Sequence, residues 1–302
     1  MPTAKQTAPI GTGRWIVKSF DSSATVLVRN DTYWGEKPLF ARMELKVAPD
    51  ELAGANGLRS GDLDVIGGDW LAPLSPRRAL ALESDGMKVA SEPGTATMLL
   101  GFSPKSPMVA DKAVRDAIAI SIDRATMPKV LFEGFAHPTF ELFSANVPSS
   151  GTQHPVPVRD IAKAKSILTE GGWAESGGAW SKSGSPLSLD FLVSDESLPG
   201  SRRIAEMIQG QLSEVGFQVK VSSVDNATMH ERRPACEYDL AFLRPMARLT
   251  PPHGTLGNSF VSTADSGPDG EIYVSDTLDV IVKTAFEASG AERELKMRAI
   301  YG

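Results

Sequence analysis

The sequence predicts an α/β protein, and two observations carry that prediction. Segments with the alternating polarity of strands are followed by segments of about 10–15 residues with helical periodicity. The chain has 302 residues, and a single hydrophobic core rarely grows beyond about 250–300 residues. We therefore expect a layered α/β structure with more than one domain.

The first stretch, up to about residue 95, is predicted to be rich in strands. Its predicted strands are residues 14–20, 25–29, 43–47 and 63–66. The turn residues 21–23 separate the first two strands, which favours a hairpin. One helix interrupts this stretch: Asp50 is a suitable N-cap, and Gly61 is a suitable terminator.

From residue 97 onward, helices alternate with strands. The clearest helix is 201–215, which Gly216 ends and which carries an apolar stripe of Ile204, Ile208, Leu212 and Val215. The other predicted helices are 111–121, 124–132, 160–170, 276–288 and 291–299, and the predicted strands are 217–221 and 238–243. The Gly- and Ser-rich residues 175–185 favour an exposed hairpin, anchored by Trp173 and Trp180.

The composition excludes several classes of protein. The chain carries 31 Lys and Arg against 37 Asp and Glu, a net charge of −6, so it lacks the electrostatic footprint of a nucleic-acid-binding protein. No run approaches the roughly 20 apolar residues that a membrane-spanning helix needs. A single cysteine, Cys236, excludes an intramolecular disulfide and any zinc or iron–sulfur site built from cysteines.

The two ends of the chain suggest a fragment. Residues 1–7 are polar and contain no apolar core of a signal peptide. The sequence stops at Gly302, directly after the last predicted helix. We therefore expect a chain that has been cut at one end or both.

Residues that could support catalysis do not form a recognisable constellation. No G-x-S-x-G elbow is present, and Cys236 lies in no local signature of a catalytic thiol. Residues 11–13 lack the remaining Gly and Lys of a phosphate-binding loop. Asp62 and Asp64 could form an acid–base pair, but a solvated strand edge is the simpler interpretation. We expect no enzymatic activity and no cofactor.

Metal-binding patterns are equally weak. The four histidines are His137, His154, His230 and His253. They lie far apart in the sequence, and none belongs to an H-x-x-x-H pair. A metal site made from this chain's histidines alone is therefore poorly supported.

Five motifs, in the same order and spacing, resemble family 5 of the solute-binding proteins of ABC importers. They cover nearly the whole chain and occupy residues 11–20, 29–38, 60–65, 112–118 with its extension 122–124, and 160–173. Arg14 is a departure, because the family usually has Pro at that position. The family captures peptides, nickel and metal chelates.

The resemblance implies a type II periplasmic-binding-protein-like fold with two lobes, of which the first is incomplete here. Residues 1–95 would form the C-terminal portion of lobe I, and residues 96–302 would form lobe II without its last elements. It also implies a location in the periplasm or on the outer face of the cell membrane. The expected partners are a small solute and an ABC permease, and we expect a monomer that binds no nucleic acid.

Within the family, the nickel-binding branch is the more similar, through residues 28–38 and 71–74. That branch carries a ligand loop of the pattern H-R-T-W-G-x-P-Y-D-P-H, which aligns with residues 243–253. Met246 and Thr250 replace its Trp and Tyr, and Pro251 replaces its Asp. The resemblance therefore leaves the choice between a peptide-like ligand and a metal chelate open.

The predicted ligand-binding residues are Arg244, Met246, Arg248, Thr250 and His253. The two arginines offer forked donors for carboxylates, although Arg248 could equally be a solvated loop charge. Met246 would form an adaptable wall. His253 is a weak candidate for a metal ligand, with capping or packing as the alternative.

The function predicted from the resemblance is that of a solute-binding component of an ABC importer. It would capture a peptide-like or nickel/metal-chelate ligand by closure of the two lobes. The alternative is a sensor or interaction module on the same fold, which would bind a small carboxylate-bearing ligand without transport.

Overall fold

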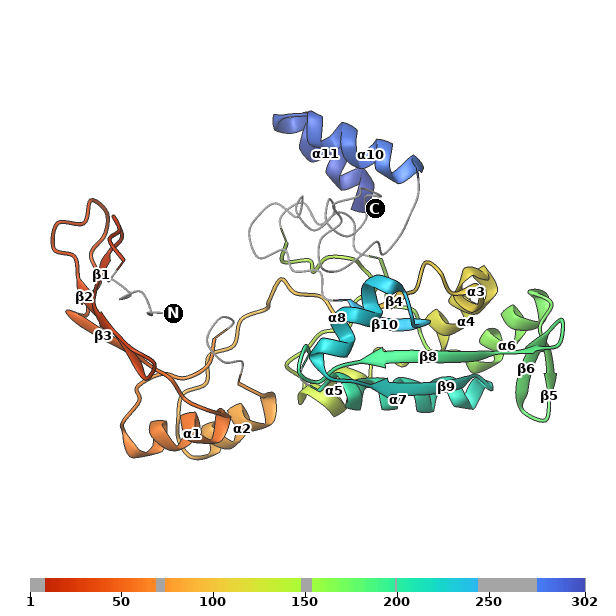
Figure 1. Cartoon of the computed structure of the whole chain (residues 1–302), viewed down its shortest axis with the longest axis horizontal. Helices are drawn as coiled ribbons and strands as arrows, with labels where there is room; N and C mark the ends of the chain where they lie inside the picture. The colour runs from red at the N-terminus through yellow and green to blue at the C-terminus, as the bar shows by residue number, and fades with distance from the viewer. Residues whose placement is uncertain (1–8, 69–73, 148–153, 199, 244–275, 302) are drawn as a thin grey trace, which may run out of the picture. The chain divides into compact units, whose positions relative to one another are not determined.

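A computed structural model describes residues 9–68, 74–147, 154–198, 200–243 and 276–301. The chain divides into two compact units, residues 1–89 and 90–302, which are described separately below. Their elements are labelled in Figure 1. The assignment of residues 1–95 and 96–302 to two lobes remains a prediction.

The first unit begins with an antiparallel sheet. Its strands are β1 (Trp15–Phe20), β2 (Ala24–Arg29) and β3 (Arg42–Lys46), in the order β1-β2-β3. The turn between β1 and β2 is built by Asp21, whose Oδ1 accepts hydrogen bonds from the amides of Ser23 at 2.7 Å and Ala24 at 2.9 Å. The predicted hairpin is therefore confirmed.

Two helices follow this sheet, α1 (Glu51–Ser60) and α2 (Pro76–Ser84). Asp50 caps α1 through a hydrogen bond from the Ala53 amide at 2.7 Å, and Gly61 ends it at φ 80°, where a residue without Cβ is favoured. The sequence did not predict α2.

The strand predicted at residues 63–66 is wrong. The Leu63 amide donates to the Gly57 carbonyl at 3.0 Å, which folds this segment back onto α1. Val65 is 82 % exposed. A strand needs a neighbour to satisfy its backbone groups, and none of the described strands pairs with these residues.

The described part of the first unit has a small core. Its buried apolar side chains are Ala55, Ala79 and Leu82. By contrast, large apolar side chains such as Leu39 at 93 % exposure and Phe40 at 70 % face outward. So small a core suits a lobe that is incomplete in this chain.

The second unit is built on a four-stranded sheet. Its strands are β4 (Leu99–Phe102), β8 (Ser188–Val193), β9 (Gln218–Ser223) and β10 (Leu240–Leu243), in the order β4-β10-β8-β9. Strands β8, β9 and β10 run parallel, whereas β4 runs antiparallel to β10. This mixed sheet confirms the predicted α/β class.

Helices cover one face of this sheet. They are α4 (Lys112–Ser121), α6 (Ile161–Glu170) and α7 (Ser201–Val215), and Figure 1 shows α7 along β8 and β9. The predicted stripe of α7 is buried in one cluster with every second residue of β8, namely Leu189, Phe191 and Val193. The apolar residues that repeat every 3.6 positions on the helix and every second position on the strand thus pack into a single core.

Shorter elements complete the second unit. They are α3 (Pro107–Ala110), α5 (Met127–Phe132), α8 (Asn226–Ala235), α10 (Asp276–Glu287) and α11 (Gly290–Tyr301). Val282, Ala285 and Met297 of the last two helices form a small separate core with Phe143 and Val147. Every helix in the described ranges is too short or too polar to cross a lipid bilayer.

The predicted hairpin forms a small sheet of β5 (Ala174–Ser176), β6 (Ala179–Lys182) and β7 (Ser185–Pro186). Asp111 fastens it to α4, because its Oδ2 accepts from Lys182 Nζ at 2.8 Å and from Trp173 Nε1 at 3.1 Å. The hydrogen bond from Lys182 lowers the pKa of Asp111, and the Ala113 amide adds to this effect. Trp173 and Trp180 are both buried, as predicted.

We expect Leu212→Ala to lower the free energy of unfolding by about 2–5 kcal/mol, because it leaves a cavity where a fully buried side chain of α7 was. Arg203→Ala on the exposed face of the same helix is the control and should change it by less than about 0.5 kcal/mol. Urea unfolding of both variants measures the difference. Equal midpoints for the two variants would contradict the assigned core.

We expect Asp111→Asn to lower the free energy of unfolding by about 1–3 kcal/mol near neutral pH, because the charged hydrogen bonds to the hairpin are lost. The folded-state pKa of Asp111 is depressed, so its stabilisation is complete above the unfolded pKa and disappears as the pH falls through the folded value. The difference between wild type and variant should therefore shrink below pH 3.8, the ordinary value. Urea unfolding at several pH values tests this, and a constant difference would refute it.

Candidate functional site

The carboxyl ends of β8, β9 and β10 lie on one edge of the four-stranded sheet. In open α/β sheets, ligands bind beyond this edge. The antiparallel strand β4 begins at this edge, because its first residue, Leu99, pairs with Leu243, the last residue of β10. Residues 97 and 98, which precede β4, therefore also lie at this edge. We therefore take this edge as the candidate site.

The loop after β8 holds the first turn of α7. Its first residue, Ser194, is buried. Asp195 Oδ1 accepts hydrogen bonds from the Arg202 amide at 2.9 Å and from Ser201 Oγ at 3.1 Å. The amides of a helix's first turn have no partner within the helix, so this carboxylate fixes where α7 begins.

The loop after β9 is joined to the loop after β8. Asp225 caps α8 by accepting a hydrogen bond from the Thr228 amide at 2.7 Å, and bonds from this amide and the Thr228 hydroxyl lower the pKa of Asp225. Glu196 Oε2 accepts from the Asn226 amide at 3.0 Å, and Ser197 Oγ donates to Asn226 Oδ1. The two loops therefore hold each other in place.

The electrostatics of the described edge follow from these contacts. A helix N-terminus carries a partial positive charge that would otherwise attract an anion. Here Asp195 and Asp225 accept hydrogen bonds from amides in the first turns of α7 and α8, and Glu196 accepts one from the first amide of α8. These two helix ends are thus neutralised internally, and a carboxylate ligand would need its positive charge from elsewhere.

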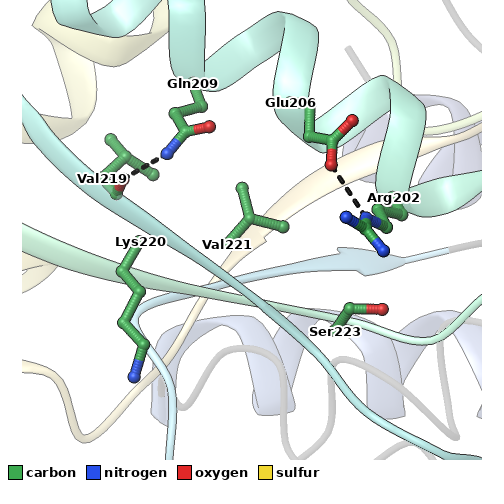
Figure 2. Close-up of a pocket in the computed structure, with 7 residues that line it drawn as sticks. All are labelled: Arg202, Glu206, Gln209, Val219, Lys220, Val221 and Ser223. Carbon is green, nitrogen blue, oxygen red and sulfur yellow. Dashed lines mark hydrogen bonds and ion pairs between the residues drawn. The ribbon is translucent and has the colours of Figure 1, made fainter.

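A shallow groove starts near this edge and follows β9. It encloses about 590 Å³ and is lined by Arg202, Glu206, Gln209, Val219, Lys220, Val221 and Ser223. Figure 2 shows its two walls, α7 and β9. Arg202 Nε pairs with Glu206 Oε1 at 2.8 Å, and Gln209 Nε2 donates to the Val219 carbonyl at 2.7 Å. The Gln209 bond satisfies a carbonyl of the edge strand β9, whereas the Arg202–Glu206 pair lies within α7, so these polar groups are already engaged with each other or with β9.

The predicted ligand-binding residues Arg244, Met246, Arg248, Thr250 and His253 lie outside the described residues. Their assignment therefore remains a prediction. The last described residue before them is Leu243, which is buried and ends β10 at the candidate edge. The segment that contains them thus begins at this edge.

Other residues considered from the sequence do not gather into a site. Cys236 ends α8 in the left-handed conformation, at φ 60°, and is partly buried. Asp62 and Asp64 are exposed, as their solvated interpretation predicts. His154 Nδ1 lies 2.8 Å from Glu141 Oε1. Within the described ranges, no group of three or more His, Cys, Asp or Glu side chains could hold a metal ion.

The sequence did not single out the residues that organise the described edge: Asp195, Glu196, Asp225 and Asn226. Asp225 carried a readable signal, because Asp directly before a helical segment is one of the favoured N-cap residues. The contacts of Glu196 join two loops and have no local signature.

Comparison with known proteins gives a consistent picture. Residues 2–267 match the family model described as bacterial extracellular solute-binding proteins, family 5 Middle. The nickel-binding periplasmic protein of Escherichia coli is 27 % identical over 83 % of this chain and 48 % of its own length. A probable di/tripeptide-binding protein of Pseudomonas aeruginosa is 25 % identical over 97 % of this chain and 53 % of its own length. The chain thus spans about half the length of these curated relatives.

Among solved structures, an ABC transporter substrate-binding protein from Sinorhizobium meliloti is 38 % identical. It superposes with a TM-score of 0.82 over 98 % of this chain and 60 % of its own. This likeness covers both units of the chain, each of which therefore has a counterpart in that structure.

We expect Asp225→Ala to lower the free energy of unfolding by about 0.5–2 kcal/mol, because α8 loses its N-cap. In hydrogen–deuterium exchange, the amides of α8 should exchange faster while those of α6 keep their rates. Asp160→Ala is the matched control, since Asp160 caps α6 in the same way through the Lys163 amide at 2.9 Å. Unchanged exchange in α8 of the Asp225 variant would contradict the capping assignment.

Proposed function

The chain belongs to family 5 of the bacterial extracellular solute-binding proteins, and from this premise we propose that it works as the solute-binding component of an ABC importer. The match over residues 2–267 is the observation that carries the proposal, and it confirms the family inferred from the five sequence motifs. The proposed ligand is a peptide-like molecule or a nickel or other metal chelate. The protein would hold this ligand and leave it chemically unchanged.

The names of the two curated relatives support these ligand classes. One binds nickel and the other is a probable binder of di- and tripeptides. Free peptides carry a terminal carboxylate, as do amino-acid chelators of metals, so both classes require a positively charged partner in the protein. The described edge does not supply it at α7 or α8, where Asp195 and Asp225 already occupy the helix ends.

The positive charge is proposed to come from Arg244 and Arg248. A guanidinium group binds a carboxylate through two parallel hydrogen bonds, which fixes its orientation as well as its position. Met246 and Thr250 would line the same site, and His253 would be the candidate ligand for a chelated metal. All five residues follow β10, whose last residue ends at the candidate edge.

In this proposal the ligand is enclosed when two lobes close around it, as in other periplasmic binding proteins. The family's extracellular character supports a location in the periplasm or on the outer face of the cell membrane. The loaded protein would then deliver the solute to an ABC permease. We propose a monomer for this role.

We expect the intact gene product that carries this sequence to bind a di- or tripeptide or nickel(II) with L-histidine in isothermal titration calorimetry. Arg244→Ala and Arg248→Ala should each weaken binding by about tenfold or more, because a charged hydrogen bond is lost. Arg203→Ala, which removes an exposed arginine of α7, is the control and should leave the affinity unchanged. The site assignment fails if both loop variants bind like the wild type.

A further inference from the structure

Asp239, the residue before β10, is bonded to both neighbouring strands. Its amide donates to the Asp190 carbonyl of β8 at 2.9 Å, and its Oδ2 accepts from the Asp190 amide at 2.6 Å. Its carbonyl accepts from the Ser103 amide at 2.9 Å, and its Oδ1 accepts from Ser106 Oγ. One residue thus ties β10 to β8 on one side and to the end of β4 on the other.

The network continues through Asp190 to the rest of the sheet. Asp190 Oδ1 accepts from Ser222 Oγ of β9, and Asp190 Oδ2 pairs with Arg232 Nη2 of α8 at 2.8 Å. The same Nη2 donates to the Glu237 carbonyl at 2.6 Å. The start of β10 is therefore connected to the end of β4, to β8, to β9 and to α8.

Strand β10 needs such an anchor because its own pairing is short. It contains four residues, and only Leu240 and Ala241 pair with β8. At about 3.3 Å per residue, Asp239 lies roughly 13 Å from Leu243, at the opposite end of the strand from the candidate edge. Asp239 is therefore too far from that edge to touch a ligand there.

We propose that Asp239 is a positioning residue for the ligand site: it fixes the place and direction in which β10 delivers the chain to the carboxyl edge. This inference rests on the proposed function, because it assumes that the solute is held there. It adds Asp239 to the residues that determine binding, although Asp239 lies at the amino end of β10, away from the candidate edge. Its effect on binding passes through the position of Leu243 rather than through contact with solute.

The chemistry of the carboxylate makes the role specific. An ionised carboxylate offers acceptors on both oxygens, which suits two donors, the Asp190 amide and Ser106 Oγ. An asparagine of the same shape can keep both contacts, with its carbonyl on the Asp190 amide and its NH₂ donating to Ser106 Oγ, but both are then hydrogen bonds between neutral groups. Asp239→Asn therefore weakens both anchoring bonds, because hydrogen bonds to an ionised carboxylate are about twice as strong as neutral ones, while it preserves the volume of the side chain.

Asp239→Asn in the intact gene product tests the inference, with nickel(II) plus L-histidine and a set of di- and tripeptides as probes. We expect the probe that the wild type binds to be held about tenfold more weakly by the variant. In the absence of ligand, the amides of Ala241 and Leu243 should exchange faster with deuterium, whereas those of α6 should keep their rates.

Asp111→Asn is the matched control, because Asp111 is also a partly buried carboxylate with several hydrogen bonds, but it holds the β5–β7 hairpin. It should lower the urea midpoint while leaving affinity and β10 exchange unchanged, which separates positioning from general stability. Ser106→Ala is a milder variant for the case that Asp239→Asn does not fold, and it should weaken binding about threefold.

The inference is overturned if Asp239→Asn, or Ser106→Ala in its place, binds the probe as tightly as the wild type. It is also overturned if β10 exchange is unchanged, or if Asp111→Asn weakens binding to the same extent. A wild-type protein that binds none of the probes contradicts the proposed function instead. In that case the exchange rates of β10 alone decide whether Asp239 anchors the strand.

Discussion

The parallel pairing of β8, β9 and β10 sets the position of the candidate site. Parallel strands end on the same edge, so three separate loops begin there. The pairing is held in place by the buried stripe of α7, which packs against alternate residues of β8. The apolar core on one face of the sheet thus fixes the strands, and the strands fix the edge at which the polar loop residues lie.

The polar side chains at that edge have two different roles, stabilising the loops and binding a ligand. The carboxylates of Asp195, Glu196 and Asp225 are all engaged with helix amides, so they stabilise the loops and are not free to bind a ligand. A protein of this family that captures a carboxylate-bearing solute therefore needs cationic side chains from another segment. Arg244 and Arg248, which we propose for this role, would meet this need, and Asp239 anchors the strand that precedes them.

Much of the fold could be predicted from local patterns. The stripe of α7, the cap at Asp50 and the helices expected at 111–121 and 160–170 were readable because each depends on residues a few positions apart. The strand predicted at 63–66 was wrong because an apolar run says nothing about whether a partner strand exists.

Long-range contacts explain the features that the sequence did not reveal. Strand β8 escaped prediction because Asp190 interrupts its apolar run, and the partners of that carboxylate, Ser222 and Arg232, lie 32 and 42 residues away. Contacts between distant residues also could not be predicted at the candidate site. Family resemblance indicated Arg244 and Arg248, whereas the bonds between Glu196 and Asn226 arise only when two loops meet in the folded chain.

Hydrogen–deuterium exchange of the intact gene product, with and without the solute that it binds, shows whether the solute is held at the carboxyl edge of the sheet. We expect bound solute to slow exchange in the loops at residues 194–200 and 224–226 and in the segment that follows β10. The hairpin β5–β7 directly precedes β8, at the opposite end of that strand from the loop at residues 194–200, and should be unaffected. Protection confined to that hairpin or to α10 and α11, with no change at the carboxyl edge, would contradict this expectation.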